Sequence, residues 1–303
     1  MILITGAAGK TGKVVLRSLV DRGEAVRALV FHPEQIQGIQ SLGAEQALAG
    51  DLRDSDLVSR AVKGIHSIYH ICPNVHPDEV TIGQSLIDAA VVEGISHFVY
   101  HSVLHPQVEA MPHHWKKMRV EERLFASGLD FTILQPAAYM QNLLANWKDI
   151  VETGKYRVPY SGETRISLVD LEDIASAATI VLTETYPETS RPAHSGATYE
   201  LVGTPGLYQV EVADILSQSL GRKILAESIQ LEAWETNARK SGMSDYQVDT
   251  LIKMFKYYQD YGFEGNSNVL EWLLPRPITD LSSFLKRVTA QDVRLQKTTE
   301  PQR

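Results

Sequence analysis

Three glycines near the start of the chain, Gly6, Gly9 and Gly12, have a spacing that could bind a phosphate group. They follow a short apolar run, typical of a buried strand, and precede a helical pattern that begins near Lys10. Gly6 would allow a tight turn, Gly9 a close backbone approach to an anion, and Gly12 close packing of helix on strand. The amide groups that start the helix would face a pyrophosphate, so the segment predicts a dinucleotide site.

The spacing is Gly-x-x-Gly-x-x-Gly rather than Gly-x-Gly-x-x-Gly, so a strand–helix turn without a phosphate ligand is the alternative interpretation. Within the loop, Ala8, Lys10 and Thr11 are further expected cofactor contacts. Lys10 and Lys13 could supply positive charge, or they could be ordinary solvated lysines at the start of a helix.

The end of the second predicted strand bears on the choice of cofactor. An acidic residue at this point is typical of NAD binding, and an arginine is typical of NADP binding. This chain has Phe31 and His32 instead. No carboxylate would repel the extra phosphate, so the sequence favours NADP and leaves NAD open. Phe31 has no group that binds a phosphate and could simply flank the adenine.

Further candidates follow the third and fourth predicted strands. Asp51 and Leu52 are expected at the adenine edge, although Asp51 could instead cap the next helix. Cys72, Pro73 and Asn74 are expected to line the ribose and nicotinamide side, and Pro73 cannot continue the strand ladder. Cys72 is interpreted as a small buried residue, because no neighbour in the sequence would activate a thiolate.

Strands and helices that would position these residues alternate along the first half of the chain. After the first strand, strands are predicted at 25–30, 45–49, 67–71, 97–101 and 130–135, with helices at 33–42, 55–62, 79–92 and 116–126. Such alternation gives right-handed βαβ units and a parallel sheet covered on both faces. The predicted fold class is α/β, a Rossmann-type doubly wound parallel sheet with a smaller C-terminal α/β substrate lobe.

The second half of the chain is less regular. Helices are predicted at 169–183, 208–220 and 243–261, and a strand at 198–202. The aromatic run at 255–263 could line an apolar pocket or be simple core. The expected domains are an NAD(P)-binding domain at 1–155 with its sheet completed by parts of 165–202, a substrate-binding lobe at 156–287, and a polar, frayed tail at 288–303. The lobe is expected to close a cleft over the carboxyl ends of the strands.

Composition narrows the classes of protein. The chain of 303 residues is 44% hydrophobic with a net charge of −8, which argues against non-specific nucleic-acid binding and anionic membranes. A single cysteine excludes an internal disulfide, and no metal site is expected. No apolar run approaches the roughly 20 residues of a membrane span. The chain enters a strand directly, so no signal peptide is expected and the expected location is the cytoplasm. A homo-oligomer or a regulatory protein partner stays open.

Several residue runs occur together in one order: GAAGKTG at 6–12, VRALV at 26–30, GDL at 50–52, FVYHS at 98–102, KMRVE at 117–121, DFTILQP at 130–136, YMQN at 139–142 and VDLEDIA at 169–175. In this order the chain resembles the NmrA-like branch of the atypical short-chain dehydrogenases/reductases. That branch is related to the isoflavone and phenylcoumaran benzylic ether reductases. The resemblance covers nearly the whole chain and does not define a substrate.

The resemblance implies where catalysis would occur. Typical short-chain dehydrogenases carry Tyr-x-x-x-Lys on one helix face, where the lysine holds the nicotinamide ribose and lowers the tyrosine pKa. This chain keeps the lysine as Lys117 and has His113 in the tyrosine's place, which argues against ordinary carbonyl reduction. Lys117 is expected to orient the ribose and to donate or accept a proton. His113, with an ordinary pKa near 6.5, could assist. Alternatively, His113 flanks the helix in a loop and Lys117 serves only the cofactor.

Five further residues take expected roles from the resemblance. Ser102 would contact the cofactor and hydrogen-bond the substrate oxygen, or would only close a strand end. Pro136 and Ala137 would pass beneath the nicotinamide. Tyr139 and Asn142 would lead toward the substrate, although Asn142 could instead fix a turn.

The sequence thus predicts an NAD(P)H-dependent reductase of a small apolar, aromatic or quinone-like compound, without the usual catalytic tyrosine. The alternative is a non-catalytic NAD(P)-binding redox sensor of the kind that names the family. The missing tyrosine favours the sensor, whereas Lys117 and the aromatic C-terminal part favour the enzyme. A nucleotide-sugar epimerase is less consistent, because that chemistry uses the tyrosine as its base.

Overall fold

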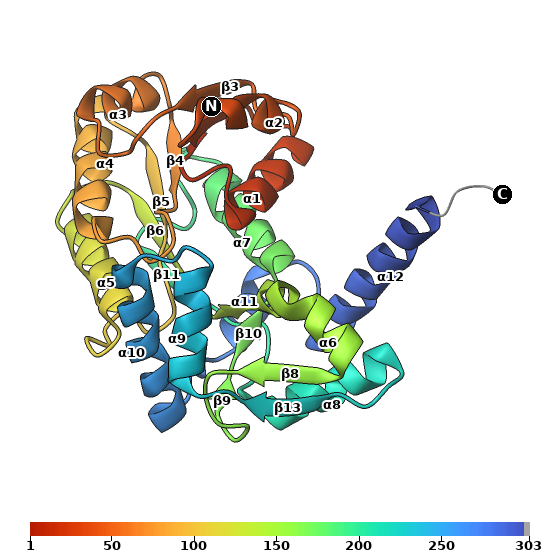
Figure 1. Cartoon of the computed structure of the whole chain (residues 1–303). Helices are drawn as coiled ribbons and strands as arrows, with labels where there is room; N and C mark the ends of the chain where they lie inside the picture. Colours follow the sequence, from red (N-terminus) through yellow and green to blue (C-terminus); the bar gives the residue numbers. More distant parts are fainter. Residues whose placement is uncertain (300–303) are drawn as a thin grey trace. The chain divides into compact units, whose positions relative to one another are not determined.

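A computed structural model describes residues 1–299, and the side chains of residues 1–290 (Figure 1). Contacts between residues divide the chain into two compact units. The first unit comprises residues 1–136, 171–201 and 272–274, and the second comprises the remaining described residues. The predicted domain bounds stay a prediction, and each unit is described by itself.

The first unit contains one parallel sheet, and its strands within residues 1–299 follow the order β11-β6-β5-β4-β1-β2-β3. The seven strands, in chain order, are β1 (Ile2–Ile4), β2 (Val26–Val30), β3 (Gln46–Ala49), β4 (Ser67–His70), β5 (His97–His101), β6 (Phe131–Pro136) and β11 (Ala197–Leu201). In the register, Ile4 pairs with Ala28 on one side and with Tyr69 on the other. The strand order reverses at β1, which confirms the predicted doubly wound sheet and places the switch point between β1 and β4.

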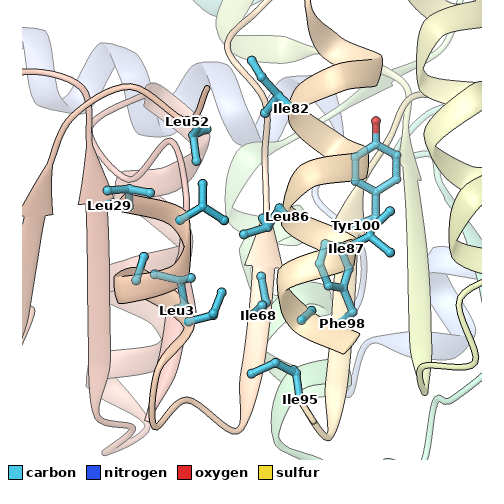
Figure 2. Close-up of a cluster of buried hydrophobic side chains, with 14 of the residues drawn as sticks. Leu3, Leu29, Leu52, Ile68, Ile82, Leu86, Ile87, Ile95, Phe98 and Tyr100 are labelled. Atoms are coloured by element: carbon cyan, nitrogen blue, oxygen red, sulfur yellow. The ribbon is translucent and has the colours of Figure 1, made fainter. Parts of the chain in front are cut away.

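Helices cover both faces of this sheet (Figure 1). One group is α1 (Lys10–Asp21), the turn η1 (Pro33–Gln35), α2 (Ile36–Gln40) and α7 (Leu171–Thr183), and the other is α3 (Ser55–Val62), α4 (Glu79–Glu93) and α5 (Pro112–Phe125). The hydroxyl groups of Ser18 and Thr179 join α1 to α7 at 2.7 Å. A core of apolar side chains from the strands and from α3, α4 and α5 fills the second face, as Figure 2 shows for Leu3, Phe98 and Leu86.

Helix α4 shows why the sequence packs in this way. Its buried side is a stripe at spacings of three and four residues, formed by Glu79, Ile82, Gly83, Leu86, Ile87 and Ala90. Five of these six residues are apolar and buried. The sixth, Glu79, is a carboxylate within an apolar stripe, and it requires a polar partner inside the protein.

The second unit is a smaller α/β region built from short strand pairs. The pairs are β7 (Ala138–Tyr139) with β10 (Leu168–Val169), β8 (Lys155–Val158) with β13 (Leu225–Ser228), and β9 (Arg165–Ile166) with β12 (Leu207–Tyr208). Its helical elements are η2 (Met140–Asn146), α6 (Trp147–Thr153), α8 (Gln209–Leu220), α9 (Leu231–Lys240), α10 (Asp245–Tyr261) and α12 (Leu281–Thr299). Helix α11 (Asn268–Leu273) reaches residues assigned to both units.

The aromatic run of the second unit divides between core and surface. Tyr258 and Phe263 are buried and stack with their ring centroids 4.6 Å apart, as the core interpretation predicts. Tyr261 is 73% exposed and pairs with Tyr257.

Most predicted elements occur within a few residues of their expected bounds. Three predictions need correction. The helix predicted at 116–126 begins four residues earlier at Pro112, a residue well suited to a first helical position. The helix predicted at 33–42 is a 3-10 turn followed by the short α2. The helix predicted at 169–183 begins at Leu171, because residues 168–169 form β10.

The C-terminal segment continues as helix through the described residues. Helix α12 includes residues 288–299 of the expected polar tail, and residues 300–303 lie outside the described residues. Among residues 1–299, no helix combines the length and the apolar composition needed to cross a membrane.

Candidate functional site

The glycine loop between β1 and α1 is closely packed at all three of its glycines. Gly6 has a φ of +59°, and a Cβ atom there would lie 2.8 Å from the carbonyl oxygen of Ile71. A Cβ atom on Gly12 would lie 2.7 Å from the Cα atom of Ala7. A Cβ atom on Gly9 would lie 3.2 Å from the carbonyl oxygen of Gly6, which is also a tight contact. The loop therefore leaves little room for a side chain at any of the three positions, as expected for a turn that brings its backbone close to a phosphate.

The start of α1 has the properties of an anion site. Gly9 is the residue before the helix, and the first turn contains no acidic side chain. The first amide groups of a helix have no partner within the helix and carry its positive dipole end. Gly9 and Lys10 are exposed, Ala8 is half-buried, and Thr11 is buried. The loop therefore fits the diphosphate of a dinucleotide.

A cavity of about 110 Å³ lies beside the loop, within the first unit. It is lined by Gly6, Leu29, Val30, Phe31, Gly50, Asp51, Leu52, Arg53, Pro73, His76 and Ile82. The structure thus brings together five predicted cofactor residues, Gly6, Phe31, Asp51, Leu52 and Pro73. The mostly apolar lining with an ion pair suits a flat heterocyclic base.

Arg53 is a cavity residue that the sequence analysis missed. Its guanidinium donates to both carboxylate oxygens of Asp51, at 2.6 Å from Nη2 to Oδ2 and 3.0 Å from Nε to Oδ1, and its Nη1 lies 3.2 Å from Asp78. These hydrogen bonds lower the pKa of Asp51 below its usual value. The alternative role of Asp51 as a helix cap is excluded, because Asp54 caps α3 by accepting from the amides of Asp56 and Leu57.

His32 lies next to Phe31 but outside the cavity lining. The two rings meet edge to face with centroids 4.6 Å apart, and Phe31 is 56% exposed. His32 precedes η1 and takes part in a capping box with Gln35. No acidic side chain lines the cavity from the end of β2, in agreement with the sequence.

The segment after β4 carries three more predicted cofactor residues. Pro73 and Asn74 are exposed, whereas Cys72 is buried, and burial raises the pKa of its thiol. Val75 follows with a φ of 48°, a conformation that is costly for a β-branched residue. Such backbone conformations concentrate at functional sites.

Lys117 projects from α5 into a buried polar cluster at the carboxyl end of β5. Its Nζ donates to Oε1 of Glu79 at 3.0 Å and to the carbonyl oxygen of His101 at 3.3 Å. The hydroxyl of Tyr100 donates to the same Glu79 oxygen at 2.8 Å. The ammonium also lies 5.4 Å from the centroid of the Tyr100 ring. Lys117 is thus fixed by three elements, α4, α5 and β5.

Within this cluster, Lys117 and Glu79 form a buried ion pair. Burial alone would raise the pKa of Glu79, but the charge and hydrogen bond of Lys117 and the hydrogen bond of Tyr100 bring it below its usual value. Burial, together with the Glu79 carboxylate, raises the pKa of Tyr100 well above its ordinary range. Glu79 is therefore a carboxylate, and Tyr100 keeps its proton. Sequence reasoning missed Glu79, although a carboxylate in the apolar stripe of residues 79–90 was a signal that could have found it.

His113 lies one helical turn before Lys117, inside α5 rather than in a loop. Among the described residues, its buried Nδ1 atom has no hydrogen-bond partner. Burial and the positive charge of Lys117 lower the pKa of His113 to about 4. The imidazole is neutral at pH 7, which corrects the expectation of a pKa near 6.5. Its catalytic role stays a prediction.

The model of one protein family matches this chain over residues 1–290. The chain belongs to the NmrA-like family. The family comprises Rossmann-type NAD(P)-binding proteins of the atypical short-chain dehydrogenase/reductase class. The resemblance noted in the sequence is confirmed.

Two relatives match this NmrA-like protein over most of its length. An NAD(P)H azoreductase from Xenophilus azovorans is 29% identical over 291 residues, covering 94% of this chain and 97% of the relative. Quinone oxidoreductase 2 from Escherichia coli is 25% identical over 290 residues, covering 95% of this chain and 98% of the relative.

Solved structures show the same fold. The NADPH-dependent quinone oxidoreductase from Escherichia coli, in complex with NADPH, has a TM-score of 0.82 at 24% identity and covers 95% of this chain and 100% of its own. NmrA, a negative transcriptional regulator in complex with NAD, has a TM-score of 0.77 at 17% identity and covers 98% and 97%. These structures therefore contain NADPH in one case and NAD in the other.

In this NmrA-like protein, Ser102 has a different environment from the one expected. Its side chain is 2% exposed, and its hydroxyl donates to Oε1 of Glu121. The amide of Gln135 donates to both oxygens of the same carboxylate, at 3.1 and 3.0 Å. The Ser102 hydroxyl therefore donates its hydrogen bond within the protein in this structure, and its predicted substrate contact stays a prediction. The predicted cofactor contact of Ser102 stays a prediction.

The remaining predicted residues divide between the two units. Pro136 ends β6 in the first unit and is buried, whereas Ala137, also buried, begins a segment of the second. Tyr139 pairs with Val169 in the β7–β10 register, and Asn142 is exposed in η2. Their predicted cofactor and substrate roles stay predictions. Among residues 1–299, no group of three or more histidine, cysteine, aspartate or glutamate side chains could hold a metal ion.

Proposed function

We propose that this NmrA-like protein is an NAD(P)H-dependent reductase of small quinone-like or other aromatic acceptors, with NADPH as its preferred cofactor. One observation carries the proposal. The glycine loop follows β1, and the Lys117 ammonium bonds the carbonyl oxygen at the end of β5, so both lie at the carboxyl edge of one parallel sheet. Open α/β sheets bind nucleotides at this edge.

Each part of the cofactor has candidate residues. The loop at 6–12 would hold the diphosphate, and the cavity with Phe31, Asp51 and Leu52 would hold the adenine. Lys117 would donate to the nicotinamide ribose. Cys72, Pro73, Asn74, Pro136 and Ala137 would adjoin the ribose and nicotinamide. The first three of these residues follow β4, Pro136 is the last residue of β6, and Ala137 follows it.

The preference for NADPH rests on the end of β2. Phe31 and His32 place no carboxylate where the additional phosphate would lie. The exposed Lys10 and Lys13 at the start of α1 add positive charge nearby.

The choice of acceptor follows from the proton donors around Lys117, because the remaining N–H group of the ammonium itself would bind the ribose and its predicted role as a proton donor stays a prediction. When bound, the reduced nicotinamide supplies a hydride. A ketone that accepts a hydride becomes a strongly basic alkoxide and needs a proton donor, the role of the missing tyrosine. A quinone that accepts a hydride becomes a phenolate, whose conjugate acid has a pKa of about 10, as for tyrosine. Such a product needs no acid from the protein, because water can protonate it after the hydride transfer.

The groups near Lys117 fit an acceptor of this kind. His113 is neutral at pH 7. The hydroxyl groups of Ser102 and Tyr100 donate hydrogen bonds to the carboxyl groups of Glu121 and Glu79. The names of the two relatives, an azoreductase and a quinone oxidoreductase, also support an easily reduced conjugated acceptor.

The test is NADPH oxidation by the purified protein with three acceptors of similar size: a benzoquinone, an azo dye and a saturated ketone. We expect protein-dependent oxidation with the quinone or the dye, and none with the ketone. Lys117→Ala should lower this rate at least about a hundredfold, because it removes the donor to the ribose. Lys116→Ala is the matched control, since its ammonium bonds the Pro77 carbonyl instead, and it should retain activity.

Two outcomes would overturn the proposal. Tight NADPH binding without oxidation by any acceptor would favour the sensor. Reduction of the ketone at a rate similar to the quinone would contradict the argument from the missing acid.

A further inference from the structure

We propose that Glu79 is a positioning residue, which holds the Lys117 side chain fixed with one N–H group directed to the cofactor. The inference rests on the proposed cofactor site and adds a residue that neither the sequence nor the comparisons identified.

The hydrogen bonds of Lys117 show how Glu79 directs the ammonium group. An ammonium group has three N–H donors. Glu79 and the His101 carbonyl take two of them, which leaves one without a partner among the described residues. With its stem held in α5 and two donors fixed, Lys117 can present the third donor in one direction only. A ribose hydroxyl is a suitable acceptor for that donor.

The burial of the Glu79–Lys117 pair indicates a role other than stability. The side chains of Glu79 and Lys117 are 4% and 15% exposed. Replacing a buried ion pair by apolar residues is often neutral or stabilising, whereas removing one partner leaves a costly unpaired charge. Glu79 belongs to the buried stripe of α4, whose other members are apolar, so an apolar residue would suit this position. The carboxylate is therefore better explained by its effect on Lys117 than by stability.

The surroundings of Glu79 fix its carboxylate in place. Glu79 lies in the first turn of α4, where the helix dipole favours a negative charge. The Tyr100 hydroxyl fixes the same oxygen that binds Lys117. One carboxylate oxygen thus accepts from two donors, which restricts the rotamers of all three side chains.

Other titratable side chains also face the pair. They are His70, Cys72, Tyr100, His101, His113, His114 and Glu121. Burial lowers the pKa values of His70, His101 and His113 to about 4, 3 and 4 and also lowers the pKa of His114, so these imidazoles are neutral at pH 7. Burial raises the pKa values of Cys72 and Tyr100, so both keep their protons. Glu79 is therefore the carboxylate that pairs with the Lys117 ammonium.

The test substitutes Glu79→Gln, which keeps the shape and an acceptor oxygen but removes the charge. Affinity for NADPH is measured by fluorescence titration. In the variant the Lys117 ammonium loses the charged partner that fixes it, so the dissociation constant should be at least about tenfold higher than in wild type. Glu79→Asp keeps the charge and should restore most of the affinity. Wild-type affinity in Glu79→Gln would overturn the inference.

A second readout needs no cofactor. Acylation of Lys117 by acetic anhydride, measured by mass spectrometry of its peptide, proceeds through the neutral amine. Lys117 should react faster in Glu79→Gln than in wild type at the same pH. Asp88→Asn is the matched control, because Asp88 lies on α4 and pairs with Arg123 outside the cluster, and it should leave the reactivity of Lys117 unchanged. Equal reactivity in wild type and Glu79→Gln would contradict the inference.

A double-mutant cycle separates positioning from a purely structural role. In a Lys117→Met background, Glu79→Gln should not weaken NADPH binding further and should raise the thermal midpoint, since it removes an unpaired buried charge. An equal loss of affinity in both backgrounds would contradict the inference. If wild type binds no NADPH, the proposed function fails, and the acylation experiment still tests the pair. If wild type binds NADPH and neither readout responds to Glu79→Gln, only the inference fails.

Discussion

Phe31 occupies the position at which Rossmann-type proteins distinguish NAD from NADP. It lines the cavity beside the glycine loop and is 56% exposed, so a substitution there changes the local charge with little effect on the core. The local charge at this position should therefore decide the cofactor preference.

Phe31→Asp should weaken NADPH binding about tenfold, or about 1.4 kcal/mol, through repulsion of the extra phosphate. It should leave NADH binding unchanged or stronger, because a carboxylate can accept from the ribose hydroxyls. Phe31→Asn is the control for the lost ring. Fluorescence titration of both cofactors measures the effect, and equal losses in the two variants would show that charge at this position does not matter.

His113 illustrates how an environment changes a residue's chemistry. A histidine in solution titrates near pH 6.5, but burial beside Lys117 lowers the pKa of His113 to about 4. We therefore expect the rate of quinone reduction to show no titration near pH 6.5, and His113→Asn to leave the profile from pH 6 to 8 unchanged in shape. Initial rates across that range provide the measurement. A titration near pH 6.5 that disappears in His113→Asn would instead identify His113 as an acid or base.

At the scale of elements, the junction of β1 and α1 depends on the lack of a side chain at Gly12. A Cβ atom there would lie 2.7 Å from the Cα atom of Ala7 and would also meet the carbonyl oxygen of Gly6. Both are backbone atoms that cannot move independently of the loop. Gly12→Ala should destabilise the fold by about 1–3 kcal/mol through overpacking, and should abolish NADPH binding by opening the loop.

Gly38→Ala is the matched control for this loop. Gly38 lies in α2 with no atom within 4 Å of an added Cβ, so alanine should stabilise the protein by about 0.5–1 kcal/mol. Urea unfolding and NADPH titration measure both variants. Retained NADPH binding in Gly12→Ala would contradict the proposed role of the loop.

The helices and strands also show what the sequence could predict. Hydrophobic periodicity is local, so the strands at 26–30 and 97–101 and the helix at 55–62 were predicted almost to the residue. The start of α5 was missed because Pro112 and two histidines interrupt the apolar pattern, although proline is common at the first helical position.

The site was predictable only where its residues are close in sequence. The glycine loop is one continuous run, and the cavity brings its first glycine together with four other predicted residues. Glu79 and Lys117 are 38 residues apart, and Arg53 binds Asp51 across a turn that no periodicity describes. Contacts between elements and the pKa shifts that burial causes depend on the tertiary structure, so Glu79 and the neutral state of His113 required it.

At the scale of the whole molecule, buried histidines should determine the response to acid. His70 and His97 are 0% and 1% exposed, and burial lowers the pKa of each to about 4. In the unfolded chain they titrate near 6.5, so the unfolded state binds more protons between pH 6.5 and 4. Stability is therefore fully present above pH 6.5 and decreases as pH falls through that range, by up to about 1.4 kcal/mol per pH unit for each histidine.

Urea unfolding at several pH values tests this expectation. His97→Gln keeps a donor for the Thr132 hydroxyl and should reduce the slope of stability against pH below 6.5. Identical slopes in wild type and His97→Gln would mean that His97 is protonated in the folded protein.

Calorimetric titration with NADPH shows whether the glycine loop binds a reduced nicotinamide dinucleotide. We expect a saturable signal with one site per chain in wild type and Gly38→Ala, and none in Gly12→Ala. No heat of binding in the wild-type protein with either NADPH or NADH, or a signal that Gly12→Ala leaves unchanged, would contradict it.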